Sequence, residues 1–456
     1  MPNTSVQTLS NNQESEAKWP SVVLMVVGIS SFMVALDVTA LNVALMSIGR
    51  DFSTGLNMLQ WVVGAYTLIF ASFLLTAGTL SDLIGAKKVF ITALCIFTLA
   101  SLACSFSENI TFLIISRIFQ GIGAAILLPS SMALLTNAFP DPQKRSQAVA
   151  IWGGISAIAL VTGPIIGGLL VETLGWRSIF AMNVPFCMIA IMGTLIASGT
   201  PQAHTRSFDF PGQILAIIFL ISITFVFIEG PVLGWRSIYI LSVILVTICS
   251  AILFYIVESH QRDPMLPIEL FTSQTFSASI STAFLQTLAY YGTLFIIPLA
   301  LQAKGMKPMQ IGFLLLPMTI ATAIFAIFSA KISEYISLRI FGFLGMFCGG
   351  IGSVLLSLSG LNYWSLIVGG VLIGLGGATL PIIVGATLAS VPLRRIGIGS
   401  GVLNAARQSG GTFGVAILGS LLYGSNMDSK FALLMIALSF FFASILTFFY
   451  LYRKEN

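Results

Sequence analysis

The sequence is dominated by apolar segments that are each long enough to cross a bilayer as a helix. About fourteen can be counted between residues 20 and 451, separated by short polar loops. A membrane helix needs roughly 20 apolar residues, because its backbone polar groups must be satisfied within the hydrocarbon layer. The chain is 57% hydrophobic and 8% charged, whereas soluble domains carry roughly 25% charged residues. We therefore predict an all-α integral membrane protein with about 14 transmembrane helices.

An internal repeat divides these segments into two sets of six. Residues 78–87 align with residues 330–339, and Gly121-Ile-Gly123 aligns with Gly374-Leu-Gly376 at nearly the same offset. The repeat predicts two pseudo-symmetric six-helix bundles, at 19–200 and at 265–456, with a linker that carries two extra helices at 201–264 between them. The second range ends in a short cytoplasmic tail. Residues 1–18 are polar and lack a signal peptide, so we expect a disordered cytoplasmic tail. Carriers built from such repeats bind substrate between their halves.

The placement of lysine and arginine predicts the orientation of the chain in the membrane. With the N-terminus inside, thirteen of these residues fall in cytoplasmic segments and six in outer loops. Cytoplasmic loops of membrane proteins carry an excess of positive charge. We therefore expect a multi-pass protein of the cell inner or plasma membrane with both termini in the cytoplasm.

Two isolated charges lie deep within apolar segments. Asp37 is the only ionisable residue between Pro20 and Ile48, and Arg117 lies about two turns into the fourth segment. Charges at this depth usually face a bundle interior or a wet cavity and take part in transport. We predict that Asp37 is the main proton-coupling carboxylate and that Arg117 tunes it. The structural alternatives are an ion pair that only stabilises the fold, and an arginine that snorkels to the outer surface.

A polar motif at residues 78–88 closes the second segment on the predicted cytoplasmic side. Its acid and two bases can form ion pairs across the mouth of a cavity. We predict a cytoplasmic gate held by Asp82 together with Lys87, Lys88 or Arg145. Solvated loop charges are the alternative interpretation.

The fifth segment carries a cluster of glycines around a proline. Proline bends a helix by removing a backbone donor, and glycines let a neighbouring helix approach backbone to backbone. We interpret these residues as part of the gating machinery, a role that is compatible with a plain packing interface: Gly163, Pro164, Gly167 and Gly168.

Several aromatic, amide and basic side chains within the predicted helices are candidates for the lining of a substrate cavity, although each could also be an ordinary packing residue. They are Asn42, Tyr66, Gln120, Gln286, Tyr290, Tyr291, Asn404 and Arg407.

Other classes of protein are disfavoured by what the sequence contains. Its five cysteines and two histidines lack metal or disulfide spacing, and we expect no metal and no cofactor apart from protons as coupling ion. There is no basic cluster of the kind that binds nucleic acid. A membrane enzyme would need a nucleophile–base pair or a similar cluster, and a sensor would need longer loops. We expect a monomeric secondary transporter of a small molecule, embedded in the lipid bilayer.

Taken together, the motifs resemble those of the major facilitator superfamily, and specifically its fourteen-helix drug:proton antiporter branch. The residues that carry the resemblance lie at 36–45, 78–88, 117–123, 163–168, 176–185, 209–212 and 404–411. The resemblance spans almost the whole chain. It implies proton-driven export of amphipathic drugs or toxic compounds by alternating access, and hence multidrug efflux and antibiotic resistance. The fifth-segment motif is associated in this family with antiport.

The chain also departs from the family pattern. Leu83 and Ala86 replace residues of the loop motif that are usually basic, and Met46 replaces a proline at the end of the first-segment motif. The tenth and thirteenth segments lack the deep acid of relatives that handle divalent cationic drugs. We therefore expect lipophilic or singly charged substrates. Dedicated export of an endogenous metabolite, such as a siderophore, lipid precursor or amino acid, is the alternative.

Overall fold

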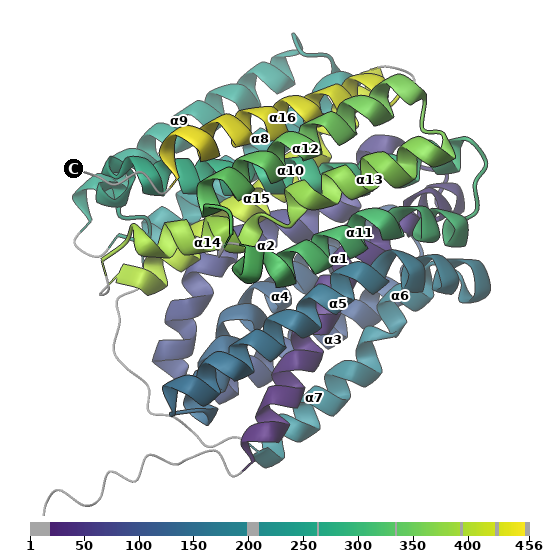
Figure 1. Ribbon diagram of the computed structural model, residues 1–456. Helices are drawn as coiled ribbons and strands as arrows, with labels where there is room; N and C mark the ends of the chain where they lie inside the picture. Colours follow the sequence, from purple (N-terminus) through teal and green to yellow (C-terminus); the bar gives the residue numbers. More distant parts are fainter. Residues whose placement is uncertain are drawn as a thin grey trace, which may run out of the picture.

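The structure is a computed structural model in which helices form the whole fold (Figure 1). It describes residues 19–197, 209–261, 264–332, 335–392, 395–424 and 428–451, without the side chains at 75, 76, 78, 79, 82, 330 and 424. These ranges contain α-helices and one short 3-10 helix, and no strand, which confirms the predicted all-α class. The predicted tail at 1–18 and residues 201–208 of the predicted linker lie outside them.

The helices follow one another closely along the chain. They are α1 (Pro20–Asp51), α2 (Leu56–Ile84), α3 (Ala86–Ser105), α4 (Ile110–Ala138), α5 (Pro142–Leu174), α6 (Arg177–Ala181), α7 (Asn183–Ala197), α8 (Phe210–Leu233), α9 (Ile238–His260), η1 (Ile268–Thr272), α10 (Gln274–Ala303), α11 (Pro308–Ile332), α12 (Leu338–Ser359), α13 (Tyr363–Gly377), α14 (Leu380–Ala389), α15 (Ile396–Gly424) and α16 (Lys430–Tyr450).

Thirteen stretches of the described chain are long and apolar enough to cross a membrane, with α6–α7 and α13–α14 each making one crossing. Helix α15 has the same length as α2 and α4, but Asn404, Arg407 and Gln408 make its middle polar. Counting α15, the described chain has fourteen candidate crossings, in agreement with the predicted number of about fourteen. An even number of crossings places the start of α1 and the end of α16 on the same side of the membrane.

Short polar side chains and glycines define the helix ends. Asn109, Asp141 and Asn362 each cap a helix by accepting a hydrogen bond from a backbone N–H three residues further on, which satisfies a donor that the helix leaves unpaired. Gly85 turns the chain between α2 and α3 with a φ of 95°, a conformation that costs little only for glycine. These devices keep the loops short, so successive helices pack side by side.

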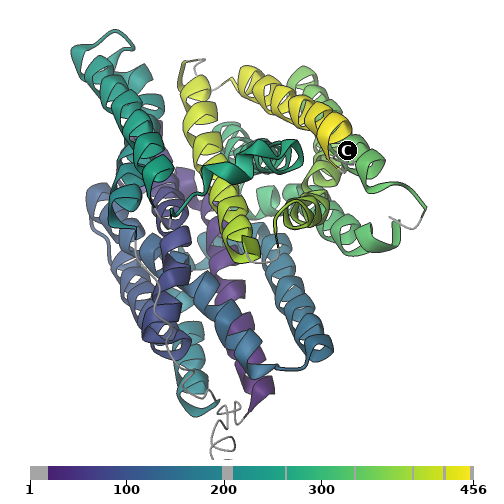
Figure 2. The same ribbon diagram turned by 90° about the vertical axis from the view of Figure 1, so that its left-hand side faces the viewer.

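The N-terminal helices α1–α7 and the C-terminal helices α10–α16 form two groups that meet at one end and diverge at the other (Figures 1 and 2). Near the α1–α2 loop, Gln60 of α2 donates to the carbonyl oxygens of Val415 and Ala416 at 3.0 and 2.9 Å. Gln302 of α10 donates to Val43 O of α1 at 2.9 Å. We call this side, where amides from each half bond to the backbone of the other, the closed end.

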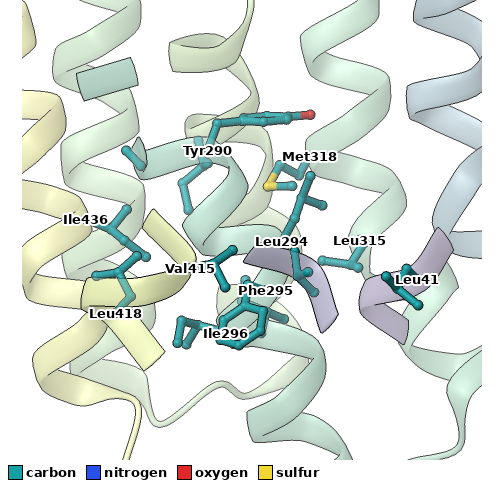
Figure 3. Packing of buried hydrophobic residues seen from close by; sticks show 14 of the residues in the cluster. Leu41, Tyr290, Leu294, Phe295, Ile296, Leu315, Met318, Val415, Leu418 and Ile436 are labelled. Carbon is teal, nitrogen blue, oxygen red and sulfur yellow. The ribbon is translucent and has the colours of Figure 1, made fainter. Parts of the chain in front are cut away.

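Apolar side chains from both halves continue the packing at the closed end. Figure 3 shows Leu41 of α1 near Leu315 of α11, with Leu294 of α10 between Leu315 and Val415 of α15. A second cluster belongs to the N-terminal half alone and includes residues of α2, α3 and α4. The larger core therefore joins the halves, while the smaller one holds the N-terminal half together.

Glycines bring α5 into backbone contact with α1 and α11. A Cβ atom on Gly168 would lie 2.7 Å from Pro308 O, and one on Gly312 of α11 would lie 2.5 Å from Pro164 O. On the other side of α5, a Cβ on Gly167 would lie 2.6 Å from Ala40 O, and one on Gly163 would overlap Thr39. The fifth-helix motif therefore lies between α1 and α11.

The inserted helices α8 and α9 pack against one another, and α8 also contacts α2 and α15. Glu229 of α8 is buried, and it accepts hydrogen bonds from Trp61 Nε1 at 2.8 Å and from Asn57 Nδ2 at 3.3 Å. Nearer the other end of α8, Gln213 donates to Ser72 O at 2.8 Å. These bonds join α2 of the N-terminal half to the inserted pair, which is drawn in teal in Figure 2.

The close approach of α5 and α11 leads to a prediction. Gly312→Ala places a methyl group against the backbone of Pro164, so it should push the two helices apart and loosen the closed end. In a cysteine-free background with a single cysteine at Thr412, which is buried there, the reaction with a polar maleimide should become several-fold faster. Gly153→Ala is the control, because a Cβ at Gly153 meets nothing within 4 Å. Equal labelling rates in the two variants would contradict the prediction.

Candidate functional site

The two deep charges found in the sequence form an ion pair within the N-terminal half. Arg117 Nη1 of α4 lies 2.5 Å from Asp37 Oδ2 of α1, and the two side chains are 1% and 0% exposed. A buried charge without a partner is strongly unfavourable, whereas a pair is tolerated when further hydrogen bonds satisfy the remaining atoms. The rest of this cluster supplies those bonds.

Arg117 is held from several sides. Its Nη1 also donates to Gln120 Oε1 at 2.7 Å, and its Nε donates to Val62 O of α2 at 3.1 Å. The guanidinium lies over the ring of Tyr66, 4.1 Å from the ring centre. A planar guanidinium with several donors suits such a site better than a lysine ammonium would.

Asp37 also accepts hydrogen bonds through its second oxygen. Gln120 Nε2 donates to Asp37 Oδ1 at 3.0 Å, and Asn183 Nδ2 of α7 donates to the same atom at 3.2 Å. Gln120 Nε2 also donates to Ser101 Oγ of α3 at 3.0 Å. Helices α1, α2, α3, α4 and α7 therefore all contribute to one network, which we call the Asp37 network.

The sequence analysis did not single out two members of this network as site residues. Asn183 is an amide within an apolar segment, so its polarity at that depth was a usable signal. Ser101 had no such signal, because many serines in this chain bond only to their own helix backbone, as Ser72 and Ser130 do.

A cavity of about 1850 Å³ lies between the two halves. Its wall includes Val34 and Val38 of α1, Trp152 of α5, Thr322 of α11 and Arg407 of α15, and apolar residues predominate. Pockets for drug-sized ligands usually measure about 300–1,000 Å³. This cavity can therefore hold a large ligand, or smaller ligands in more than one position.

The cavity opens on the side opposite the closed end. Ser81 near the end of α2, Glu269 of η1, and Arg395 and Gly397 near the start of α15 all border it. The start of α15 is thus separated from the end of α2 by the mouth of the cavity. This is the side on which the positive-charge distribution predicts the cytoplasm.

The residues predicted to line the cavity lie in three places. Tyr290, Tyr291, Asn404 and Arg407 border the large cavity. Tyr66 and Gln120 belong to the Asp37 network. The remaining two lie elsewhere: Gln286 donates to Gly377 O at 2.9 Å, and Asn42 borders a small pocket that also touches Val38, Tyr291 and Gln408.

The predicted gating residues of the 78–88 motif lie around the junction of α2 and α3. Lys87 Nζ donates to Leu195 O of α7 at 3.2 Å, Lys88 is exposed, and Arg145 is half-buried near the start of α5. The side chain of Asp82 is outside the described part of the structure.

One turn of α1 connects the Asp37 network to the cavity. Val34, Ala35 and Val38 border the cavity, whereas Asp37 faces α4 and is not on the cavity wall. Phe70 of α2 also borders the cavity, and its ring packs edge-on against Tyr66, with 5.9 Å between the ring centres. A ligand that moves α1 or Phe70 would therefore disturb the environment of the ion pair.

Among the described residues, no group of three or more histidine, cysteine, aspartate or glutamate side chains could hold a metal ion.

Two groups of membrane helices around a cavity that opens on one side form the arrangement that is typical of a membrane transporter. Comparison with known proteins identifies the family. The family model described as Major Facilitator Superfamily matches residues 27–256, 212–414 and 279–456, and the chain belongs to this superfamily, in its drug efflux branch. The relationship proposed from the sequence motifs is thus confirmed.

Relatives and a solved structure agree with this assignment. The chain is 34% identical over 405 residues to the multidrug resistance protein Stp of Mycobacterium tuberculosis, covering 88% of this chain and 75% of Stp. It is 34% identical over 448 residues to the methylenomycin A resistance protein of Bacillus subtilis, covering 96% of both chains. A crystal structure of a POT family transporter in complex with a thioalcohol-conjugated peptide shares the fold, with a TM-score of 0.70 at 13% identity over 92% of this chain and 94% of that one.

The burial of the ion pair leads to a second prediction. Arg117→Gln leaves the Asp37 carboxylate without a cation in a dry site, so it should lower the free energy of unfolding by about 3–5 kcal/mol. The double variant Asp37→Asn with Arg117→Gln should recover most of the loss, because no charge is left unpaired. Equilibrium unfolding in mixtures of SDS and mild detergent measures both values.

The exposed ion pair between Asp51 and Arg177, with N–O 2.7 Å and side chains 44% and 43% exposed, is the matched control. Arg177→Gln should cost about 1 kcal/mol or less, because water screens that pair. A similar loss at both sites would show that burial does not set the strength of the Asp37–Arg117 pair.

Proposed function

We propose that the chain is a proton-coupled antiporter that exports amphipathic drugs or toxic compounds across the cell membrane by alternating access. The observation that carries the proposal is the position of α1, which presents Asp37 to the ion-pair network and, within the same turn, Val34 and Val38 to the cavity. One helix is thereby in contact with both the candidate proton site and the candidate substrate site.

The relatives and the cavity support a drug-like substrate. Relatives of this chain are named for multidrug resistance and for resistance to methylenomycin A. The cavity is large and mostly apolar, with a small number of polar side chains that could orient a ligand. A molecule with a lipophilic body and a few polar groups fits this lining.

The proposed cycle starts from the conformation seen here. With both termini in the cytoplasm, as the positive-charge distribution favours, the cavity faces the cytoplasm and can load substrate. Rocking of the halves then opens the closed end at α5 and α11, and brings the Asp82, Lys87, Lys88 and Arg145 region towards the start of α15 to close the other side. Export thus needs no cofactor besides protons.

In this cycle the proton acts through Asp37. A protonated Asp37 is neutral, so its attraction to Arg117 is weakened, and the network that holds α1 against α4 and α7 is loosened. Release of the proton to the cytoplasm restores the ion pair. Because α1 also forms part of the cavity wall, the proton and the substrate can each alter the site of the other, which is the coupling that antiport requires.

The third prediction tests this role of Asp37. Asp37→Asn mimics the protonated side chain permanently, so it should abolish export driven by a pH gradient while substrate exchange across the membrane continues. Uptake of a fluorescent dye into inside-out vesicles, with and without an imposed pH gradient, measures both activities. Asp51→Asn, at the exposed end of the same helix, should transport like the parent protein. Full gradient-driven uptake by Asp37→Asn would contradict the proposal.

A further inference from the structure

The cavity contains an arginine whose charge is not neutralised by the protein. Arg407 lies in the middle of α15 and borders the cavity, and its Nη1 donates to Asn404 Oδ1 at 3.1 Å. Its Nε is buried and has no hydrogen-bond partner. Within the described part of the chain, no carboxylate lies within ion-pair distance of this guanidinium.

The other deep arginine shows how unusual this is. Arg117 has a carboxylate, an amide oxygen, a backbone carbonyl oxygen and an aromatic ring around it. In the described part of the structure, the Arg407 side chain donates one hydrogen bond, to the amide oxygen of Asn404. A guanidinium carries five N–H donors and keeps its charge in proteins, so most of the donors of Arg407 remain available to a molecule in the cavity.

Arg407 lies near the closed end of the cavity, and the carboxylates of the cavity lie near its mouth. Five residues beyond Arg407, Thr412 donates to Thr67 Oγ1 of the N-terminal half at 3.0 Å. At the mouth, Glu269 is paired with Arg395 at 2.7 Å, and Glu258 Oε2 accepts from Leu266 N at 3.0 Å.

The third carboxylate at the mouth belongs to Asp209, and it accepts from Gly212 N at 3.0 Å and from Met265 N at 3.3 Å. The mouth thus holds carboxylates that have local hydrogen-bond donors. The deep part of the described cavity wall is positive.

Resting on the proposed export function, we propose that Arg407 is the binding site for an anionic group of the substrate. The ligand class is an amphipathic monoanion, with a carboxylate or another planar oxyanion at one end of an apolar body. Two parallel N–H donors of a guanidinium match the two oxygens of a carboxylate. The apolar body would lie against the wall formed by residues such as Val38 and Trp152, and Tyr291 would flank the charged end.

Such a ligand would also solve an electrostatic problem of the carrier. When the halves rock, the charge of Arg407 moves with α15 through a region of low dielectric constant, where an unpaired charge is costly. A bound monoanion neutralises it, so the loaded cavity carries no net charge at this position. A neutral ligand of the same shape leaves the guanidinium uncompensated.

The test compares two probes that share an apolar body and differ in charge, one being a carboxylate and the other its neutral methyl ester. The purified protein in detergent is titrated with 1-pyrenebutyrate and with its methyl ester, and binding is followed by the fluorescence anisotropy of the pyrene. We expect Arg407→Gln to raise the Kd of the acid about tenfold or more, because a hydrogen bond to a charged group is lost. The Kd of the ester should change less than about twofold.

Two further variants make the result specific. Arg407→Lys keeps the charge without the planar pair of donors, so its Kd for the acid should lie between those of the parent protein and Arg407→Gln. Arg177→Gln removes an exposed arginine that does not border the cavity, so it should leave both Kd values unchanged. Retained binding of the ester by Arg407→Gln also shows that this variant is folded.

The outcomes separate this inference from the proposed function. If the parent protein binds the ester but not the acid, the anion site is overturned and drug export still stands. The same conclusion follows if the parent protein binds the ester and Arg407→Gln changes the Kd values of both probes equally. Binding of neither probe by the parent protein would count against the cavity as a site for amphipathic molecules, and so against both proposals.

Discussion

The buried pair of Asp37 and Arg117 is the interaction on which the organisation of the N-terminal half depends. Neither charge is tolerable alone in a site that excludes water, and each needs more hydrogen bonds than the other can supply. The backbone of α2 and side chains of α3, α4 and α7 provide them. Five helices are therefore held in one arrangement by polar bonds, within a bundle whose outer surface is apolar.

The two halves consequently treat their deep arginines in different ways. In the N-terminal half, Arg117 is enclosed by protein, and its partner can change only by protonation or by movement of a helix. In the C-terminal half, Arg407 borders the cavity and keeps most of its donors available. This asymmetry places the buried ion pair in one half and the proposed anion-binding arginine in the other, although the sequence repeat makes the halves look alike, and both halves contribute to the cavity wall.

Much of this arrangement could be predicted from the sequence because the membrane makes single residues conspicuous. Asp37 and Arg117 stood out as lone charges in apolar segments, and the fourteen crossings followed from segment length. The sequence could not show which polar residues face which space. Tyr66 and Tyr291 are both tyrosines within apolar segments, yet Tyr66 stacks on Arg117 and Tyr291 borders the cavity. The difference arises because helix rotation and tilt are set by packing between distant segments. The side on which the cavity opens likewise depends on contacts between the halves, such as that of Gln60 with α15.

The inserted helices have a mechanical consequence for the rocking of the halves. Helix α8 touches α2 of one half and α15 of the other, so it cannot stay fixed to both when they move. Directional hydrogen bonds from Trp61 and Asn57 to Glu229, and from Gln213 to Ser72 O, join α8 to α2. Its contact with α15 includes the edge-on rings of Phe227 and Phe413, whose centres are 6.4 Å apart. Apolar contacts have no required direction, so this contact fixes the orientation of α8 less tightly than the hydrogen bonds to α2 do. The inserted pair should therefore move together with the N-terminal half, while α15 moves past the apolar surface of α8.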